Sequence, residues 1–158
     1  MIFQPERADA RQFFFSAWQK AQDKVPLAAS EKMAYQIMQA HPEYHSLLNQ
    51  AERYKDQEWP AELGETNPFL HMSLHMAIDE QLSIDQPFGI RELYRLCCIK
   101  YASDATGHDA QHEMMDGLVE MIWQAQRTQT PMDIAIYLNA IRRKLDLPIV
   151  QTNPIEPL

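Results

Sequence analysis

All six histidines of the chain fall into pairs with the spacing H-x-x-x-H, and the three pairs are His41 and His45, His71 and His75, and His108 and His112. Six histidines placed at random over this length would give on the order of 0.2 such pairs. Residues four apart lie roughly 6 Å apart on one face of an α-helix, so two imidazoles at this spacing can bind one transition-metal ion. The spacing therefore predicts a metal site.

Carboxylates at helical spacing extend the candidate ligand set. Glu52 follows His45 by seven residues, so a continuous helix would place both side chains on one face. Asp79 and Asp116 each follow a histidine by four residues, and their role as ligands is left open. The predicted metal ligands are His41, His45, Glu52, His71, His75, His108 and His112.

The residue types in this set restrict the metal. Imidazole with carboxylate suits Zn, Fe, Cu, Ni or Mn, whereas Ca and Mg need shells made almost wholly of oxygen. The set contains no cysteine, which excludes a structural zinc site of the cysteine type. Its size exceeds the needs of one tetrahedral ion, so it is either a dinuclear iron or zinc centre or a single ion whose ligands are oriented by the spare histidines.

The chemistry of such a centre depends on whether the metal keeps an open position. A metal with an open position could activate water or bind dioxygen, with Glu52 or Asp79 moving a proton. A metal with a closed shell would act as a structural clip. The sequence alone does not distinguish an enzyme from a clip.

Helices must position these residues. Apolar residues recur at helical spacing and the chain has only four glycines, which indicates an all-α protein. The 158 residues fit one domain. We expect a single domain over residues 1–147, built as a helical bundle of about five to seven helices. A Pro-containing tail follows over residues 148–158.

Residues that typically begin helices indicate where the histidines lie relative to the predicted helices. Pro42 suits the first position of a helix predicted over residues 42–54, and it disfavours helical geometry at His41, whose direction is therefore not set. Asn67 caps the central helix and Pro68 begins it. The last histidine pair lies at the start of the next long helical pattern.

Composition excludes several classes of partner. The net charge is −8 and the 14 Lys and Arg form no long run, so no nucleic-acid partner is expected. The N-terminal residues lack the basic and apolar runs of a signal peptide, and no apolar stretch approaches membrane-spanning length. We therefore expect a cytoplasmic protein without a membrane partner. Cys97 and Cys98 are adjacent, lack the C-x-x-C spacing, and are expected to be buried free thiols.

The alternative hypothesis needs no metal. The chain would then be a helical interaction module or a homodimer whose histidines form a buried polar network or a pH switch. Its stability would respond to mild acid and not to chelators.

Two segments, NPFLHMSLHMAIDEQLSIDQPFGIR and HDAQHEMMDGLVEMIWQAQR, resemble a family of small bacterial proteins described only as a domain of unknown function. The resemblance covers about His41 to Leu138, and it implies a small cytosolic protein of proteobacterial type without naming an activity. The histidine pairs are also similar in spacing to hemerythrin-like and DinB-like metal proteins. Asp79 and Asp116 give H-x-x-x-D where hemerythrin has H-x-x-x-E.

Overall fold

The computed structural model describes residues 7–59, 67–101 and 106–150. These residues form eight α-helices and one short 3₁₀ helix and contain no strand, so the predicted all-α class is confirmed. Two of the helices, α3 and α4, are single turns of four residues, which is why the count exceeds the predicted five to seven. Within the described residues, no helix combines the length and apolar character that crossing a membrane requires.

The chain divides into two compact units, Met1–Asp79 and Glu80–Leu158, which are described separately. Unit 1 contains α1 (Arg7–Gln22), α2 (Ala29–Gln39), η1 (Pro42–Tyr44), α3 (His45–Leu48), α4 (Ala51–Tyr54) and α5 (Pro68–Ile84) as far as Asp79. Unit 2 contains the last turn of α5, α6 (Ile90–Tyr101), α7 (His108–Thr128) and α8 (Ile134–Lys144). The predicted single domain over residues 1–147 stays a prediction.

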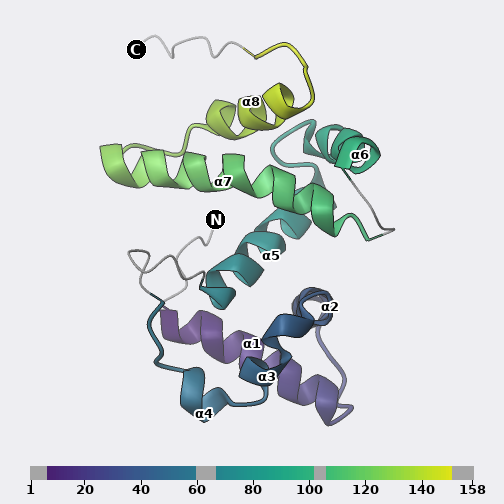
Figure 1. Cartoon of the computed structure of the whole chain (residues 1–158), viewed down its shortest axis with the longest axis vertical. Coiled ribbons are helices and arrows are strands. Elements are labelled where there is room, and N and C mark those ends of the chain that lie inside the picture. The colour runs from purple at the N-terminus through teal and green to yellow at the C-terminus, as the bar shows by residue number, and fades with distance from the viewer. Residues whose placement is uncertain (1–6, 60–66, 102–105, 151–158) are drawn as a thin grey trace. The chain divides into compact units, whose positions relative to one another are not determined.

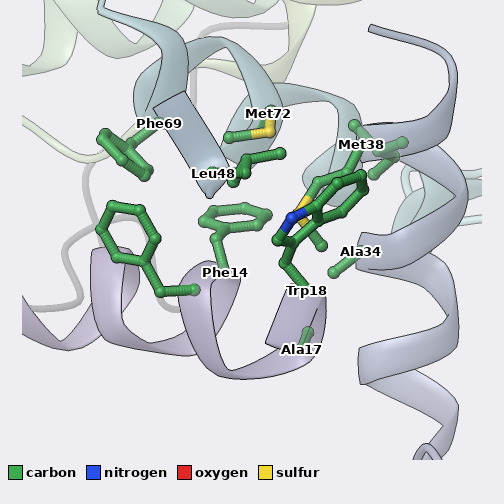
Figure 2. Packing of buried hydrophobic residues seen from close by; sticks show 10 residues of the cluster. Phe14, Ala17, Trp18, Ala34, Met38, Leu48, Phe69 and Met72 are labelled. Atoms are coloured by element: carbon green, nitrogen blue, oxygen red, sulfur yellow. The ribbon is translucent and has the colours of Figure 1, made fainter. Parts of the chain in front are cut away.

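The core of unit 1 is built by side chains from α1, α2, α3 and α5 (Figure 2). Phe14 and Trp18 lie one turn apart on α1 and are 2% and 6% exposed. Met38 of α2 and Met72 of α5 are fully buried, and Leu48 of α3 joins the same cluster. Burying one such side chain contributes about 1.5–3 kcal/mol, so this core fixes the helices that carry three of the predicted ligands.

The turn between α1 and α2 is closed by backbone and side-chain bonds. Lys24 has φ +58°, and the N–H of Val25 donates to the carbonyl of Lys20 at 2.9 Å, a pairing that ends many helices. The ammonium of Lys20 lies 2.8 Å from the carboxylate of Glu31, which also accepts the N–H of Ala28 at 3.0 Å. These contacts hold the two helices side by side (Figure 1).

The predicted continuous helix over residues 42–54 is wrong, because the chain is broken there into η1, α3 and α4. Gln50, with φ −127° and ψ 53°, lies outside the helical region. The side-chain oxygen of Asn49 accepts the indole N–H of Trp18 at 2.8 Å. The interrupted backbone is therefore tied to α1 by a contact between residues distant in sequence.

In unit 2, α7 packs against both α6 and α8 (Figure 1). A Cβ at Gly117 of α7 would lie 2.8 Å from the Cβ of Ala140 and 3.1 Å from the carbonyl oxygen of Tyr137, so only glycine permits this close approach. The buried hydroxyl of Tyr137 donates to the side-chain oxygen of Gln81 at 2.7 Å. Burial raises the pKa of Tyr137, so its phenol stays neutral.

Lys144 connects α8 to α7. Its ammonium donates to the carbonyl and to the carboxylate of Glu113, both at 2.9 Å, and to the carboxylate of Asp116 at 2.7 Å. Burial lowers the pKa of Lys144, but the hydrogen bonds to Asp116 and Glu113 outweigh it, so the pKa lies above its usual value. Asp116 is therefore engaged by a lysine on the exposed side of α7.

The first residues of the predicted tail are held against α8. The side-chain amide of Asn139 donates to the carbonyl of Val150 at 3.0 Å, and its oxygen accepts the N–H of Val150 at 2.9 Å. Residues 151–158 of the tail lie outside the described residues.

Candidate metal centre

Helix α5 positions the central histidine pair. The side-chain oxygen of Asn67 accepts the N–H groups of Phe69 and Leu70 at 2.9 and 3.3 Å, so the predicted cap is confirmed. One helical turn separates His71 and His75, whose ring centroids lie 4.8 Å apart with the ring planes at 86°. The spacing thus brings both imidazoles to one face, as the sequence predicted.

The side chain of His41 is directed by the C-terminus of α2. Its backbone has φ −121° and ψ 72°, in agreement with the restriction that Pro42 imposes. Its Nδ1 lies 2.7 Å from the carbonyl oxygen of Ile37, and a carbonyl can only accept, so Nδ1 donates. In the neutral imidazole, Nε2 therefore carries the lone pair that can bind a metal.

The rings of His41, His71 and His75 form a triangle, which we call the histidine triad. The centroid of His41 lies 5.0 Å from that of His71 and 4.9 Å from that of His75. Each ring offers a nitrogen, and these nitrogens lie within 4.8 Å of one another. His41 and His75 are 2% and 1% exposed, and His71 is half-buried. The triad therefore combines a buried setting with converging nitrogen donors.

One distance within the triad matches shared coordination. The Nε2 atoms of His41 and His71 are 3.1 Å apart. Two nitrogens bound to one ion at about 2.0–2.1 Å would be about 2.9 Å apart at a right angle and about 3.4 Å apart at a tetrahedral angle. The observed separation lies between these limits, so both atoms can bind one ion with little movement.

Tyr44 was not predicted as part of the site. Its ring stacks on that of His41, with the centroids 5.1 Å apart and the planes 5° apart. Burial, and then the charge of Glu43, raise the pKa of Tyr44. Residues three apart eclipse each other in a 3₁₀ helix, so a 3₁₀ turn beginning at Pro42 was the signal that could have identified this contact.

The structure does not bring His45 and Glu52 into the triad. The Nε2 of His45 donates to the carbonyl of Met38 at 2.8 Å, and its ring lies 4.7 Å from that of Trp18. The carboxylate of Glu52 is 90% exposed and pairs with Lys55 at 2.9 Å. The prediction for Glu52 depended on a continuous helix from His45, and the chain is broken between α3 and α4.

The predicted histidine pair of unit 2 lies at the start of α7. His108 and His112 lie on the first turns of α7, with ring centroids 4.2 Å apart and planes at 71°. Both side chains are half-buried. The expectation that they bind the same metal as the residues of unit 1 stays a prediction.

The donor set restricts the metal more strongly than the sequence did. The described residues that can jointly hold an ion are all histidines, and Asp79 is not among them. An imidazole set suits Zn, Fe, Cu or Ni and does not suit Ca or Mg. Cys97 and Cys98 belong to unit 2 and are free, as predicted, although only Cys97 is fully buried.

A family model matches most of the chain. The model of a family described as a domain of unknown function (DUF1841) matches residues 6–143. No curated protein and no solved structure matches the chain. The similarity in spacing to hemerythrin-like and DinB-like proteins therefore stays an expectation.

Proposed function

We propose that this chain, which belongs to the family described as a domain of unknown function (DUF1841), is a metal-binding protein whose histidine triad holds one iron or zinc ion. The observation that carries the proposal is the 3.1 Å separation of the Nε2 atoms of His41 and His71. His75 completes the triad from the same face of α5. Three imidazoles on one side of an ion is an arrangement that zinc and iron both accept.

The outer contacts of His41 support this function. Ligating histidines generally donate their second ring N–H to a carbonyl or carboxylate, which fixes the tautomer and makes the ligand more basic. The contact from Nδ1 to the carbonyl of Ile37 has this form. That carbonyl lies at the C-terminal end of α2, where the helix carries partial negative charge, and this further favours cation binding nearby.

The absence of carboxylates from the described donor group supports one ion in unit 1 over two. Dinuclear iron and manganese centres in helical bundles rely on several glutamates. Glu52 is exposed and paired with Lys55, and Asp79 does not belong to the group. A second ion would need donors from outside the triad.

Metal analysis of untagged protein tests the proposal. Protein from cells grown with added iron and zinc should contain about one ion per chain, and a chelator should lower the melting temperature. A ligand present at 100 times its Kd stabilises the native state by about 2.7 kcal/mol, so the shift should be easily measured.

Two variants serve as a matched pair. His75→Asn removes a triad nitrogen and should abolish stoichiometric metal, whereas His45→Asn removes a histidine whose ring binds a carbonyl and should leave the metal content unchanged. Protein that is folded, free of metal and unable to take up added iron or zinc would overturn the proposal. The 3.1 Å contact would then be a hydrogen bond between two neutral rings, as the metal-free alternative requires.

A further inference from the structure

Helix α7 of unit 2 has an exposed face that combines apolar and charged side chains. Val119 and Trp123 lie one turn apart on it and are 46% and 50% exposed. Gly117 contacts α8, and six residues turn a helix by about 600°, so Trp123 lies roughly 120° away from Gly117 around α7. We call the exposed residues of this face the α7 stripe: Asp116, Val119, Glu120, Trp123 and Arg127.

The centre of the α7 stripe has the residue types that dominate binding energy at protein interfaces. Tryptophan and arginine are enriched among the side chains whose removal weakens protein complexes most. The guanidinium carbon of Arg127 lies 5.1 Å from the centroid of the Trp123 ring. Because this contact already restricts both long side chains, less conformational entropy is lost when a partner covers them.

The charges of the α7 stripe follow a definite order along the helix. Glu120 and Arg127 are seven residues apart, so they lie two turns apart on the same face, on either side of Trp123. The carboxylate of Glu120 accepts the side-chain amide of Gln124 at 2.6 Å, and this neutral donor does not cancel its charge. The stripe therefore has an acidic side chain before its tryptophan and a basic side chain after it.

This order is self-complementary when two such helices pack antiparallel. If a twofold axis passes Trp123, Glu120 lies three residues before the axis and Arg127 lies four residues beyond it. The two charges of opposite chains then differ by only about 1.5 Å in position along the helix. The twofold axis forms the same ion pair twice and brings the two Trp123 rings together.

We propose that the α7 stripe binds the same stripe of a second copy of this chain and forms an antiparallel homodimer. A partner that fits this face must present a base and an acid in the reverse order beside an apolar centre, and the chain itself meets this requirement. A parallel arrangement would place like charges opposite each other, which disfavours it. The inference goes beyond the proposed function and does not require the metal.

The size of the α7 stripe limits the strength of this dimer. The helix between Asp116 and Arg127 is about 17 Å long. Stable complexes bury roughly 800 Å² on each partner, more than one face of a helix this short provides. We therefore expect a reversible equilibrium between monomer and dimer, with a dissociation constant in the micromolar range and not in the nanomolar range.

Sedimentation equilibrium of the full chain tests the proposal. The average mass should rise from one chain toward two as the protein is concentrated. Glu120→Arg and Arg127→Glu each place like charges opposite each other, so each variant alone should dimerise more than about tenfold more weakly. In an equimolar mixture of the two variants, every pair across the twofold axis is again attractive. The mixture should therefore recover the association that both variants lack.

Two further variants separate the α7 stripe from other exposed apolar positions. Trp123→Ala removes the centre of the stripe and should weaken the dimer. Ile99→Ala removes an apolar side chain of α6 that is 71% exposed and lies outside the stripe, so it should dimerise as the wild type does. Circular dichroism of each variant shows whether the helices are intact.

Three results would overturn the inference. One is a wild type that stays monomeric at every concentration, including the case in which a soluble quencher does not reach Trp123 because the chain itself covers it. Another is a dimer that both charge reversals leave unchanged, since the contact would then lie elsewhere. The third is a mixture of the two variants that fails to recover the association. The metal content of the protein is measured separately and does not depend on any of these results.

Discussion

The imidazole of His41 donates its Nδ1–H to the carbonyl oxygen of Ile37 across 2.7 Å. This contact predicts that His41 of the metal-free protein has its proton on Nδ1 and a lone pair on Nε2. Two-bond ¹H–¹⁵N correlation spectra distinguish the two tautomers directly. A proton on Nε2 would contradict the assignment, because Nδ1 could then not donate to the carbonyl.

The stacking of Tyr44 on His41 should contribute to metal affinity through the ring and not through the hydroxyl. Aromatic pairs contribute about 0.5–1.5 kcal/mol beyond their buried area, so Tyr44→Ala should weaken metal binding by roughly 2-fold to 12-fold. Tyr44→Phe keeps the ring and should bind as the wild type does. Competition titration with a chromophoric chelator measures both variants. Equal losses in the two would assign the effect to the hydroxyl.

The ion pair of Glu31 with Lys20 should make unit 1 sensitive to acid. The hydrogen bond from Lys20, then that from the N–H of Ala28, lower the pKa of Glu31 in the folded state. The contribution is therefore complete above the unfolded pKa of about 4.3 and is lost as the pH falls through the lower folded value. Unfolding in urea between neutral and acidic pH should show a smaller loss of stability for Glu31→Gln than for the wild type.

Lys20→Gln provides the companion to this experiment. It removes the other half of the same pair and should reduce the acid-dependent loss as well, since the main cause of the lowered pKa of Glu31 disappears. If the free energy of unfolding still falls steeply with decreasing pH in both variants, other carboxylates are responsible for the acid sensitivity.

Gly117→Ala should destabilise the protein although alanine is the better helix former. The new Cβ would lie 2.8 Å from the Cβ of Ala140, closer than such atoms approach. Overpacking of this kind lowers the free energy of unfolding by about 1–3 kcal/mol, whereas the higher helix propensity of alanine raises it by about 1 kcal/mol. Denaturant unfolding should give a lower midpoint for the variant.

The double variant Gly117→Ala, Ala140→Gly checks the mechanism. It removes the nearest clash, so its loss of stability should be smaller than the sum of the two single losses by at least about 0.5 kcal/mol. If the losses of stability of the two single variants simply add, the Cβ atoms at positions 117 and 140 do not clash.

Cys97 should be nearly inert in the native protein. Burial, followed by the charges of Cys98 and Glu113, raises the pKa of Cys97 to about 11. The thiolate is the reactive form, so alkylation near pH 8 should be on the order of 100-fold slower in the native state than in urea. In the Cys98→Ser variant, Cys97 is the only thiol of the chain, so the alkylation rate of Cys97 is measured without interference. Fast alkylation of the native variant would disprove the burial.

Local signals were sufficient for two of the three residues of the triad. Asn67 and Pro68 mark the start of α5, and a helix once started fixes the relation of His71 to His75. The same reasoning identified the all-α class and the pair on α7, because helical periodicity depends only on neighbours along the chain.

The position of His41, the third residue of the triad, and that of Glu52 depend on contacts that no local pattern contains. The indole of Trp18 binds Asn49, 31 residues away, at the break before α4, and this break separates Glu52 from the histidines. The sequence does not set the direction of His41, because Pro42 disfavours helical geometry there. Its direction comes from the carbonyl of Ile37, which becomes available only because α2 ends there.

His41 and His71 are 30 positions apart in the chain, and an ion held by both would close that stretch into a loop. In terms of chain entropy this ion is a reversible cross-link. A covalent link closing a loop of 30 residues would reduce the entropy of the unfolded chain by an amount equivalent to about 3–4 kcal/mol. The only cysteines, Cys97 and Cys98, lie outside this stretch, so a metal would restrain η1, α3 and α4 in the manner that a disulfide does elsewhere.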